Sequence, residues 1–265
     1  MRDPYSAYAT VYDRIGQTRF GEGMAKITTD WLSRHDVHPA SVLDLAAGTG
    51  AAALEFARKG MRVAGIDQSP DMLDQARSKA AEFGMRVEFS LGDMRQFSID
   101  APVELVTSFF DSFNYLLTDQ DLRDAFSAVN HSLAPDGWLI FDLNTLDRYN
   151  SAWNNATEIA WQDDHLLVIY RSTFDPATGI SPLLLTTFER IDPERDLWHR
   201  WDETHVERGY RLADVEAFLT ESGFEVVSVE QLDERTMHLD GPATERSARA
   251  VFFARKPSTL SERIE

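Results

Sequence analysis

The sequence predicts an α/β protein, with a doubly wound, mainly parallel sheet and an antiparallel β subdomain inserted after the fifth strand. From residue 41 to residue 144, short runs rich in apolar and β-branched residues alternate with helical stretches, a rhythm typical of parallel sheets wrapped by helices. Between residues 150 and 207 the rhythm gives way to strand-like runs separated by the turn clusters DPATG and DPER, which indicates antiparallel strands. With 265 residues, 43% of them apolar, the chain can form one sizeable core with a small subdomain.

The first half of the chain is expected to supply five strands, at residues 41–46, 61–67, 85–93, 103–111 and 138–144. A helix at 51–60 ends at Gly60, because glycine readily takes the left-handed conformation that closes a helix. The next helix follows Ser69, which can cap it, has Pro70 in its first position and runs to about Phe83. A third helix covers 119–133, and the turn APDG (134–137) leads into the fifth strand.

The second half contains the insertion and then resumes the sheet. The insertion is expected to hold about four strands, after which RLADVEAFLTESGF (211–224) predicts a helix with a glycine stop. The runs EVVSVEQLD and SARAVFFARK predict two last strands as a hairpin at the sheet edge, which completes a seven-stranded sheet whose last strand is antiparallel. The expected division is an N-terminal helical lid segment at 1–40, a core at 41–145 and 208–256, an inserted β subdomain at 146–207 that acts as substrate lid or dimer contact, and a loose tail at 257–265.

Composition narrows the class of partner. The net charge is −18, with 44 acidic and 26 basic residues, and such a charge repels phosphate backbones, so no nucleic-acid partner is expected. The absence of cysteine excludes a disulfide framework and a thiolate metal site, and no histidine spacing suggests another metal site. No apolar stretch approaches the ~18 residues that span a bilayer, and the first ten residues lack the apolar region of an export signal. A soluble cytoplasmic protein without membrane contact is expected.

The strongest chemical signal is the run Asp44-Leu-Ala-Ala-Gly48-Thr-Gly50 between the first strand and its helix. Small residues let the backbone of such a turn approach a ligand, and the helix N-terminus beyond presents unpaired N–H groups. Asp67 ends the second strand, where a carboxylate can accept both hydroxyls of an adenosine ribose, and Asp93 ends the third, where it can accept a hydrogen bond from an adenine amino group. Each feature alone also fits a packing turn, an Asx turn or a helix cap, but their order along three strands favours an adenosine site.

These segments resemble the class I S-adenosylmethionine (SAM)-dependent methyltransferases. VLDLAAGTG is similar to their first motif, with Ala46 where most members have the first glycine, while IDQSPDML and GDMRQF resemble the second and third. The resemblance covers about residues 5–145 and 208–255. YDRIG (12–16), FFDSFNYLL (109–117) and the inserted sheet further resemble the amino-sugar N,N-dimethyltransferases and related small-molecule methyltransferases. The resemblance implies a Rossmann-like fold and methyl transfer from SAM to a nitrogen or oxygen of a small-molecule acceptor, with S-adenosyl-L-homocysteine as the product.

The resemblance also implies which residues contact SAM. The loop Ala46–Gly50 would carry the methionine part, and Asp67 would hold the ribose. A substrate-side N-terminal segment would close over SAM, with an arginine paired to its carboxylate. The residues implied in cofactor binding are Tyr12, Arg19, Ala46, Gly48, Gly50, Asp67, Gln68, Met72, Asp93, Met94 and, through its backbone carbonyl, Phe109.

Candidates for the chemistry are aromatic and imidazole side chains. Methyl transfer is an in-line displacement that depends mainly on alignment in a dry pocket, helped by an acceptor for the released proton. Tyr115 lies where the amino-sugar enzymes have a histidine, Tyr12 would face it from the lid, and His205 would share one strand face with His199, Trp201 and Glu203. The alternatives are that Tyr115 buries the following helix and that the strand face packs on the core or forms a dimer seam.

Other functions fit less of the sequence. Gly48-Thr-Gly50-Ala-Ala-Ala53 matches the GxGxxA fingerprint of nicotinamide-dependent oxidoreductases, with Asp67 as ribose acceptor, but that fingerprint gives Gly92-Asp93-Met94 no role. Nucleic-acid base methyltransferases that act on exocyclic amines commonly need an (Asp/Asn/Ser)-Pro-Pro-aromatic element after the fourth strand, where this chain has Ser108-Phe-Phe-Asp111 without proline. A peptide or protein acceptor, and a SAM-binding protein without catalysis, stay open as alternatives.

Overall fold

A computed structural model describes residues 4–258 and contains two sheets. The main sheet has eight strands in the order β11-β10-β12-β5-β4-β1-β2-β3. Neighbouring strands from β3 to β5 are parallel, whereas β12 is antiparallel to both β5 and β10. The strands are β1 (Ser41–Leu45), β2 (Arg62–Asp67), β3 (Val87–Leu91), β4 (Val103–Ser108), β5 (Leu133–Asn144), β10 (Glu225–Asp233), β11 (His238–Pro242) and β12 (Arg249–Arg255).

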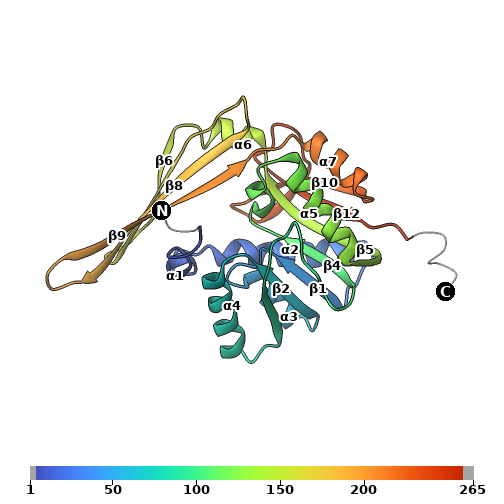
Figure 1. Cartoon of the computed structure of the whole chain (residues 1–265), viewed down its shortest axis with the longest axis horizontal. Helices are drawn as coiled ribbons and strands as arrows, with labels where there is room; N and C mark the ends of the chain where they lie inside the picture. The colour runs from blue at the N-terminus through green and yellow to red at the C-terminus, as the bar shows by residue number, and fades with distance from the viewer. Residues whose placement is uncertain (1–3, 259–265) are drawn as a thin grey trace.

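Helices cover both faces of this sheet (Figure 1), which confirms the predicted doubly wound α/β fold. Side chains of α2 and α3 pack on one face and those of α5 and α7 on the other. Ser69 caps α4 as predicted, because its Oγ accepts a hydrogen bond from the Met72 N–H at 3.2 Å. The helices are α1 (Ala9–Tyr12), α2 (Thr18–Arg34), α3 (Ala51–Arg58), α4 (Pro70–Glu82), the 3-10 helix η1 (Ser112–Tyr115), α5 (Asp119–Ser132), α6 (Leu146–Ser151) and α7 (Leu212–Glu221).

Two details of the sheet differ from the sequence prediction. The sheet has eight strands rather than seven, because the short polar segment His238–Pro242 pairs with β10 as an extra edge strand. The last strand, β12, is antiparallel as predicted but does not lie at an edge. It runs between β5 and β10, and all of its residues except the last are buried, as befits a strand covered on both faces.

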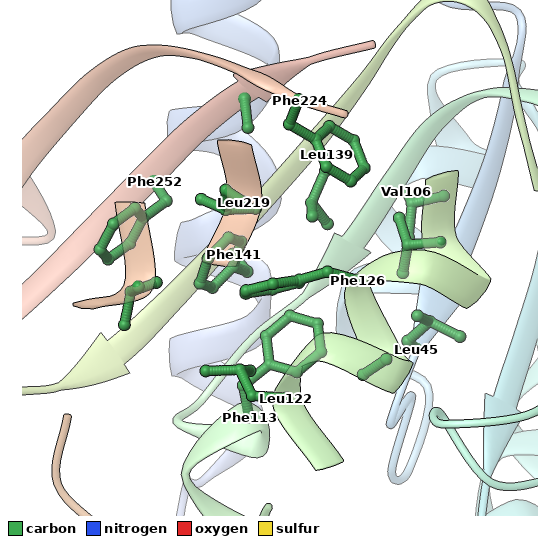
Figure 2. Close-up of a cluster of buried hydrophobic side chains, with 14 of the residues drawn as sticks. Leu45, Val106, Phe113, Leu122, Phe126, Leu139, Phe141, Leu219, Phe224 and Phe252 are labelled. Carbon is green, nitrogen blue, oxygen red and sulfur yellow. The ribbon is translucent and has the colours of Figure 1, made fainter. Parts of the chain in front are cut away.

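An aromatic cluster under α5 positions the loop that follows β4 (Figure 2). Phe113 of η1 is fully buried and meets Phe141 of β5 edge-to-face at 4.9 Å between ring centroids, and Phe141 stacks on Phe252 at 4.8 Å. Truncation of such a buried aromatic side chain typically costs about 3–5 kcal/mol. This packing fixes η1, and with it Tyr115, against the sheet.

The second sheet consists of four antiparallel strands in the order β6 (Ala156–Gln162), β7 (Leu166–Ser172), β8 (Ile180–Asp192) and β9 (Leu197–Arg208). It extends away from the main sheet, and β9 leads back to the body of the molecule (Figure 1). Its inner face packs against the N-terminal segment, which we define as residues 4–17. Leu166, Val168, Leu185 and Trp201 form one apolar cluster with Tyr8, Val11 and Ile15 of that segment.

The N-terminal segment is also tied to the main sheet. The Ser69 Oγ donates to the Tyr5 carbonyl at 3.1 Å, and the Asp13 carboxylate accepts from Thr49 and Lys79, each at 2.7 Å. The segment therefore bridges the inserted sheet and the loop after β1. Residues 259–265 of the expected tail lie outside the described residues. Within residues 4–258 no helix is long and apolar enough to span a membrane.

Candidate active site

A cavity of about 520 Å³ lies at the carboxyl edge of the parallel strands, the edge at which doubly wound sheets bind ligands. Its floor comes from the loop after β1 and the ends of β2 and β3, and its far wall from the loop after β4. Pro4, Tyr5, Ser6 and Tyr12 of the N-terminal segment close it from the other side. The cavity therefore lies between the main sheet and the segment on which the inserted sheet packs.

The loop after β1 has the tight backbone that its small residues predict. Ala46, Gly48 and Gly50 all have positive φ, at 53°, 55° and 81°. A Cβ on Gly48 would meet no protein atom within 4 Å, whereas one on Gly50 would lie 3.0 Å from Phe89 and 3.1 Å from Ala76. Gly48 thus leaves open space in the cavity that it lines, and Gly50 serves close packing.

Asp67 at the end of β2 joins this loop to the start of α4. Its Oδ2 accepts the Gly48 N–H at 2.7 Å and its Oδ1 accepts the Ser69 N–H at 2.8 Å. Burial raises the pKa of Asp67, and the backbone donors, including Gln68, oppose that shift. The carboxylate lines the cavity and retains acceptor capacity for a ligand.

Asp93 lies beside the cavity in an ion pair. Arg95 Nε contacts its Oδ1 at 3.0 Å and Arg95 Nη2 its Oδ2 at 2.5 Å, while Arg95 Nη1 also reaches Asp121 at 2.8 Å. The hydrogen bonds from Arg95 lower the pKa of Asp93. Gly92, Met94 and Arg95 line the cavity, but the Asp93 side chain does not; it is held ionised at the rim.

The structure brings together part of the predicted site. Tyr12, Ala46, Gly48, Asp67, Gln68, Met72, Met94 and Tyr115 all line the cavity. Five predicted residues do not line it: Asp93 lies at the rim, Gly50 packs behind the loop, Phe109 is buried at the end of β4, Arg19 is exposed on α2, and His205 lies behind Tyr115. Phe110, which was not predicted, lines the cavity next to Phe109.

A row of hydrogen-bonded side chains leads from the cavity wall into the protein. The hydroxyls of Tyr5 and Tyr115 are 2.7 Å apart, and the Tyr115 hydroxyl is 3.0 Å from His205 Nδ1. The hydrogen bonds end at His205, whose Nε2 lies 3.6 Å from Glu203 Oε2, within ion-pair distance but beyond that of a hydrogen bond. Burial raises the pKa of Tyr5 and of Tyr115 well above the ordinary value, so both phenols are neutral near pH 7. Tyr5 was missed by the sequence analysis, although Tyr5, Tyr8 and Tyr12 recur at a helix-like spacing that indicates a shared face.

A buried charge network supports the loop after β4. The Arg249 side chain is 1% exposed and contacts Asp142, Asp111 at 2.9 Å and Glu234 at 3.1 Å. Asp142 also accepts the backbone N–H groups of Phe110 (2.7 Å) and Asp111 (3.1 Å), which both have positive φ. Burial raises the pKa of Asp142 to about 6, against the opposing effect of Arg249. The network therefore holds the strained turn that carries Phe110 and Tyr115. Among residues 4–258, no group of three or more potential ligands is arranged to hold a metal ion.

Comparison with known proteins agrees with this geometry. Residues 42–137 match a family described as "Methyltransferase domain". A protein of Bacillus subtilis (strain 168), named "Putative methyltransferase YqeM", is 29% identical over 97% of this chain and 98% of its own length. The dTDP-3-amino-3,4,6-trideoxy-alpha-D-glucopyranose N,N-dimethyltransferase of Streptomyces venezuelae is 25% identical over 84% of this chain and 92% of its own length.

Solved structures show the same fold. A SAM-dependent methyltransferase from Clostridium acetobutylicum ATCC 824 superposes with a TM-score of 0.83 at 22% identity, covering 96% of this chain and 99% of its own. Streptomyces venezuelae DesVI superposes with a TM-score of 0.74 at 24% identity, covering 95% and 98%. Residues 42–137 match a methyltransferase domain, and the chain shares the Rossmann-like fold of solved SAM-dependent methyltransferases, which confirms the resemblance found in the three strand-end motifs.

Proposed function

We propose that this enzyme transfers a methyl group from SAM to a nitrogen of a small molecule, with an oxygen as the second choice of acceptor atom. The observation that carries the proposal is the cavity of about 520 Å³, which has Asp67 on its floor and Tyr5, Tyr12 and Tyr115 on its opposite wall. A small acceptor fits such a partly enclosed space. A peptide acceptor, the alternative within the class, would require an open groove.

The residues at the floor fit SAM in their chemistry. The space over Gly48 could take the methionine part together with Ala46, while Asp67 could accept the ribose hydroxyls, with Gln68 and Met72 beside it. Asp93 and the Met94 backbone would hold the adenine edge, and Phe109 would offer its carbonyl to the amino group. Gly50 shapes the loop. Arg19 would have to swing towards the cavity to pair with the cofactor carboxylate, because it is exposed on α2.

SAM supplies an electrophilic methyl group when it is bound. The side chains of this enzyme would align the acceptor with that methyl and exclude water. Tyr12, Phe110 and Tyr115 line the cavity and would face the acceptor, and their rings favour an apolar or ring-bearing molecule over a phosphorylated group. Tyr115 and His205 would assist the loss of the acceptor proton. Nitrogen is preferred because the Streptomyces relative is named for an amino sugar.

We further propose a cytoplasmic location, no nucleic-acid partner and a homodimer contact through the inserted sheet. The net charge of −18 supports the second point. The outward face of the inserted sheet supports the third, because it carries exposed or half-buried apolar side chains such as Ile159, Leu184 and Phe188. Measurement of the molar mass in solution tests that contact.

Calorimetry with SAM and with NAD tests the cofactor. Asp67→Ala should weaken SAM binding by about 10-fold to 150-fold, because a hydrogen bond to a charged group contributes about 1.5–3 kcal/mol. Asp74→Ala is the control, since Asp74 is exposed on the outer part of α4 and makes only a helix-surface pair with Arg77. Binding of NAD without a response to SAM would overturn the proposal.

The acceptor is found by following S-adenosyl-L-homocysteine release with a panel of amines, alcohols and peptides. The first member of the panel is dTDP-3-amino-3,4,6-trideoxy-alpha-D-glucopyranose, from the name of the Streptomyces relative. Turnover of amines or alcohols of small size supports the proposal. Turnover of peptides alone would establish the alternative.

A further inference from the structure

The row of side chains that starts at Tyr5 has one end at the cavity and the other end buried in the protein. Tyr5 and Tyr115 line the cavity. His205 and Glu203 are 2% and 0% exposed and do not line it. Glu203 also bonds the N-terminal segment: its carboxylate accepts the backbone N–H groups of Tyr5 (3.0 Å), Ala7 (2.7 Å) and Tyr8 (3.0 Å). One buried carboxylate thus contacts both the histidine and the segment that closes the cavity.

The chemistry of these side chains determines which group donates and which accepts in each hydrogen bond of the row. His205 Nε2 makes no hydrogen bond to the described residues, and Glu203 Oε2 lies 3.6 Å from it. The negative charge of ionised Glu203 favours the His205 tautomer with hydrogen on Nε2, which leaves Nδ1 as an acceptor. Tyr115 then donates to Nδ1, and Tyr5 donates to the Tyr115 oxygen. The lone pairs of the Tyr5 oxygen remain available at the cavity wall.

On the basis of the methyl-transfer function proposed above, we propose that Tyr5 is the catalytic residue that takes the acceptor's proton, and that Glu203 is a positioning residue that completes this route when the N-terminal segment is docked. The acceptor's lone pair forms the bond to the methyl carbon, and the electron pair of the broken carbon–sulfur bond stays on sulfur. The acceptor proton passes to the Tyr5 oxygen as the Tyr5 proton passes to Tyr115 and the Tyr115 proton to His205 Nδ1. The products are a neutral methylated acceptor, a neutral thioether and an imidazolium beside the Glu203 carboxylate.

Electrostatics favour His205 as the end of this route over either tyrosine. Burial raises the pKa of both phenols, so neither holds a negative charge near neutral pH and each can only pass a proton on. Burial alone would raise the pKa of Glu203 as well, but the nearby His205 and the hydrogen bonds from the amides of Tyr8 and Ala7 outweigh it and lower that pKa. Glu203 therefore stays ionised and can balance the charge that arrives on His205.

The same contacts tie the chemistry to closure of the cavity. Glu203 holds the amides of Tyr5, Ala7 and Tyr8, and in this arrangement the Tyr5 hydroxyl contacts Tyr115. Glu203 lies in the inserted sheet, far along the chain from Tyr5. The titratable groups that contact His205 are Glu203 on β9, Tyr115 of η1, and Tyr5 and Tyr8 of the N-terminal segment. Two further charged groups, Glu207 on β9 and Asp111 in the loop before η1, interact with Tyr5.

The test compares single-turnover methyl transfer, at saturating SAM, in three variants. The acceptor is the panel amine with the fastest S-adenosyl-L-homocysteine release. Tyr5→Phe should slow transfer by about 100-fold or more, the usual loss when a positioned proton acceptor is removed. Tyr8→Phe is the matched control: Tyr8 lies in the same segment, but its hydroxyl contacts Tyr170, away from the cavity, so its rate should stay close to that of the wild type.

Glu203→Gln keeps an amide oxygen for the backbone donors and removes the charge beside His205. Transfer should slow, and the midpoint of the acid limb of the rate–pH profile should move to lower pH by about one unit or more, because the imidazolium loses its counter-charge. SAM affinity measured by calorimetry should be unchanged in all three variants. If the wild-type protein does not bind SAM, the proposed methyl-transfer function itself is wrong.

Two results would overturn the inference independently. One is a Tyr5→Phe enzyme as fast as Tyr8→Phe. The other is a slow Glu203→Gln enzyme whose acid limb has not moved, since that pattern describes a carboxylate that only anchors the segment. If Glu203→Gln does not fold, the comparison of Tyr5→Phe with Tyr8→Phe still decides the role of Tyr5.

Discussion

Replacement of Arg249 by glutamine should be among the most costly single changes in the main sheet. The guanidinium is 1% exposed and contacts Asp111, Asp142 and Glu234, and removal of one partner from a buried ion pair typically costs about 3–5 kcal/mol. A domain is stable by only about 5–15 kcal/mol in total. Urea unfolding at pH 7.5 should therefore show a large fall in the midpoint for Arg249→Gln.

The same change should depend on pH in a defined direction. The ordinary pKa of Asp142 is 3.8 and burial raises it to about 6 in the folded protein, so the folded state binds more protons than the unfolded state between these values. Stability contributed at this site therefore falls as pH rises through that window. Without Arg249 the pKa of Asp142 in the folded protein rises further, so the pH window in which stability is lost extends upward. The loss of stability in Arg249→Gln, relative to the wild type, should therefore be larger at pH 8 than at pH 5.

Arg255→Gln provides the control on the same strand. Arg255 pairs with Glu225 at 2.6 Å, but the two side chains are 38% and 52% exposed, and exposed pairs typically contribute about 0–1 kcal/mol. A loss of stability in Arg249→Gln no larger than that in Arg255→Gln, or a deficit that is the same at both pH values, would contradict the role of the buried charge network.

Two further predictions concern the first motif. Gly50→Ala should destabilise the protein more than Gly48→Ala in urea unfolding. Both variants place alanine at positive φ, which costs about 1–2 kcal/mol, but only at Gly50 does the new Cβ crowd Phe89 and Ala76. Equal losses of stability would contradict the packing role of Gly50. The melting temperature of Asp44→Asn should rise relative to that of the wild type as pH increases from 5 to 8. Burial raises the pKa of Asp44 from 3.8 to about 7, so only the wild type loses stability at this site through that pH window. A difference in melting temperature that does not change with pH would refute the prediction.

The floor of the site could be predicted from the sequence because it depends on short-range rules. Asp67 ends β2, and two residues later Ser69 caps α4, so local geometry places both near Gly48. Ala46 and Gly48 adopt the positive φ that a tight turn demands. Such placement needs no knowledge of how distant segments meet.

The roof of the site could not be predicted in the same way. Tyr5 reaches the cavity because its backbone N–H is held by Glu203 of the inserted sheet, and no local pattern reports such a contact. Arg19 was implied by resemblance, but its position on α2 turns it to solvent. The short polar strand β11 becomes a strand only by pairing with β10.

Strand β9 connects the roof of the site to the core through a simple alternation. Every second side chain from Trp201 to Glu207 is buried on one face, because a strand directs successive side chains to opposite sides. Trp201 packs on the N-terminal segment, Glu203 holds its amides, His205 contacts Tyr115, and Glu207 contacts Tyr149 of α6. Pairing with β8 is regular here and shifts register only beyond Arg190, near the far end of the hairpin. A slip of one residue would turn all four side chains outward, so the register of this one pair of strands determines whether the N-terminal segment, the histidine and the cavity meet.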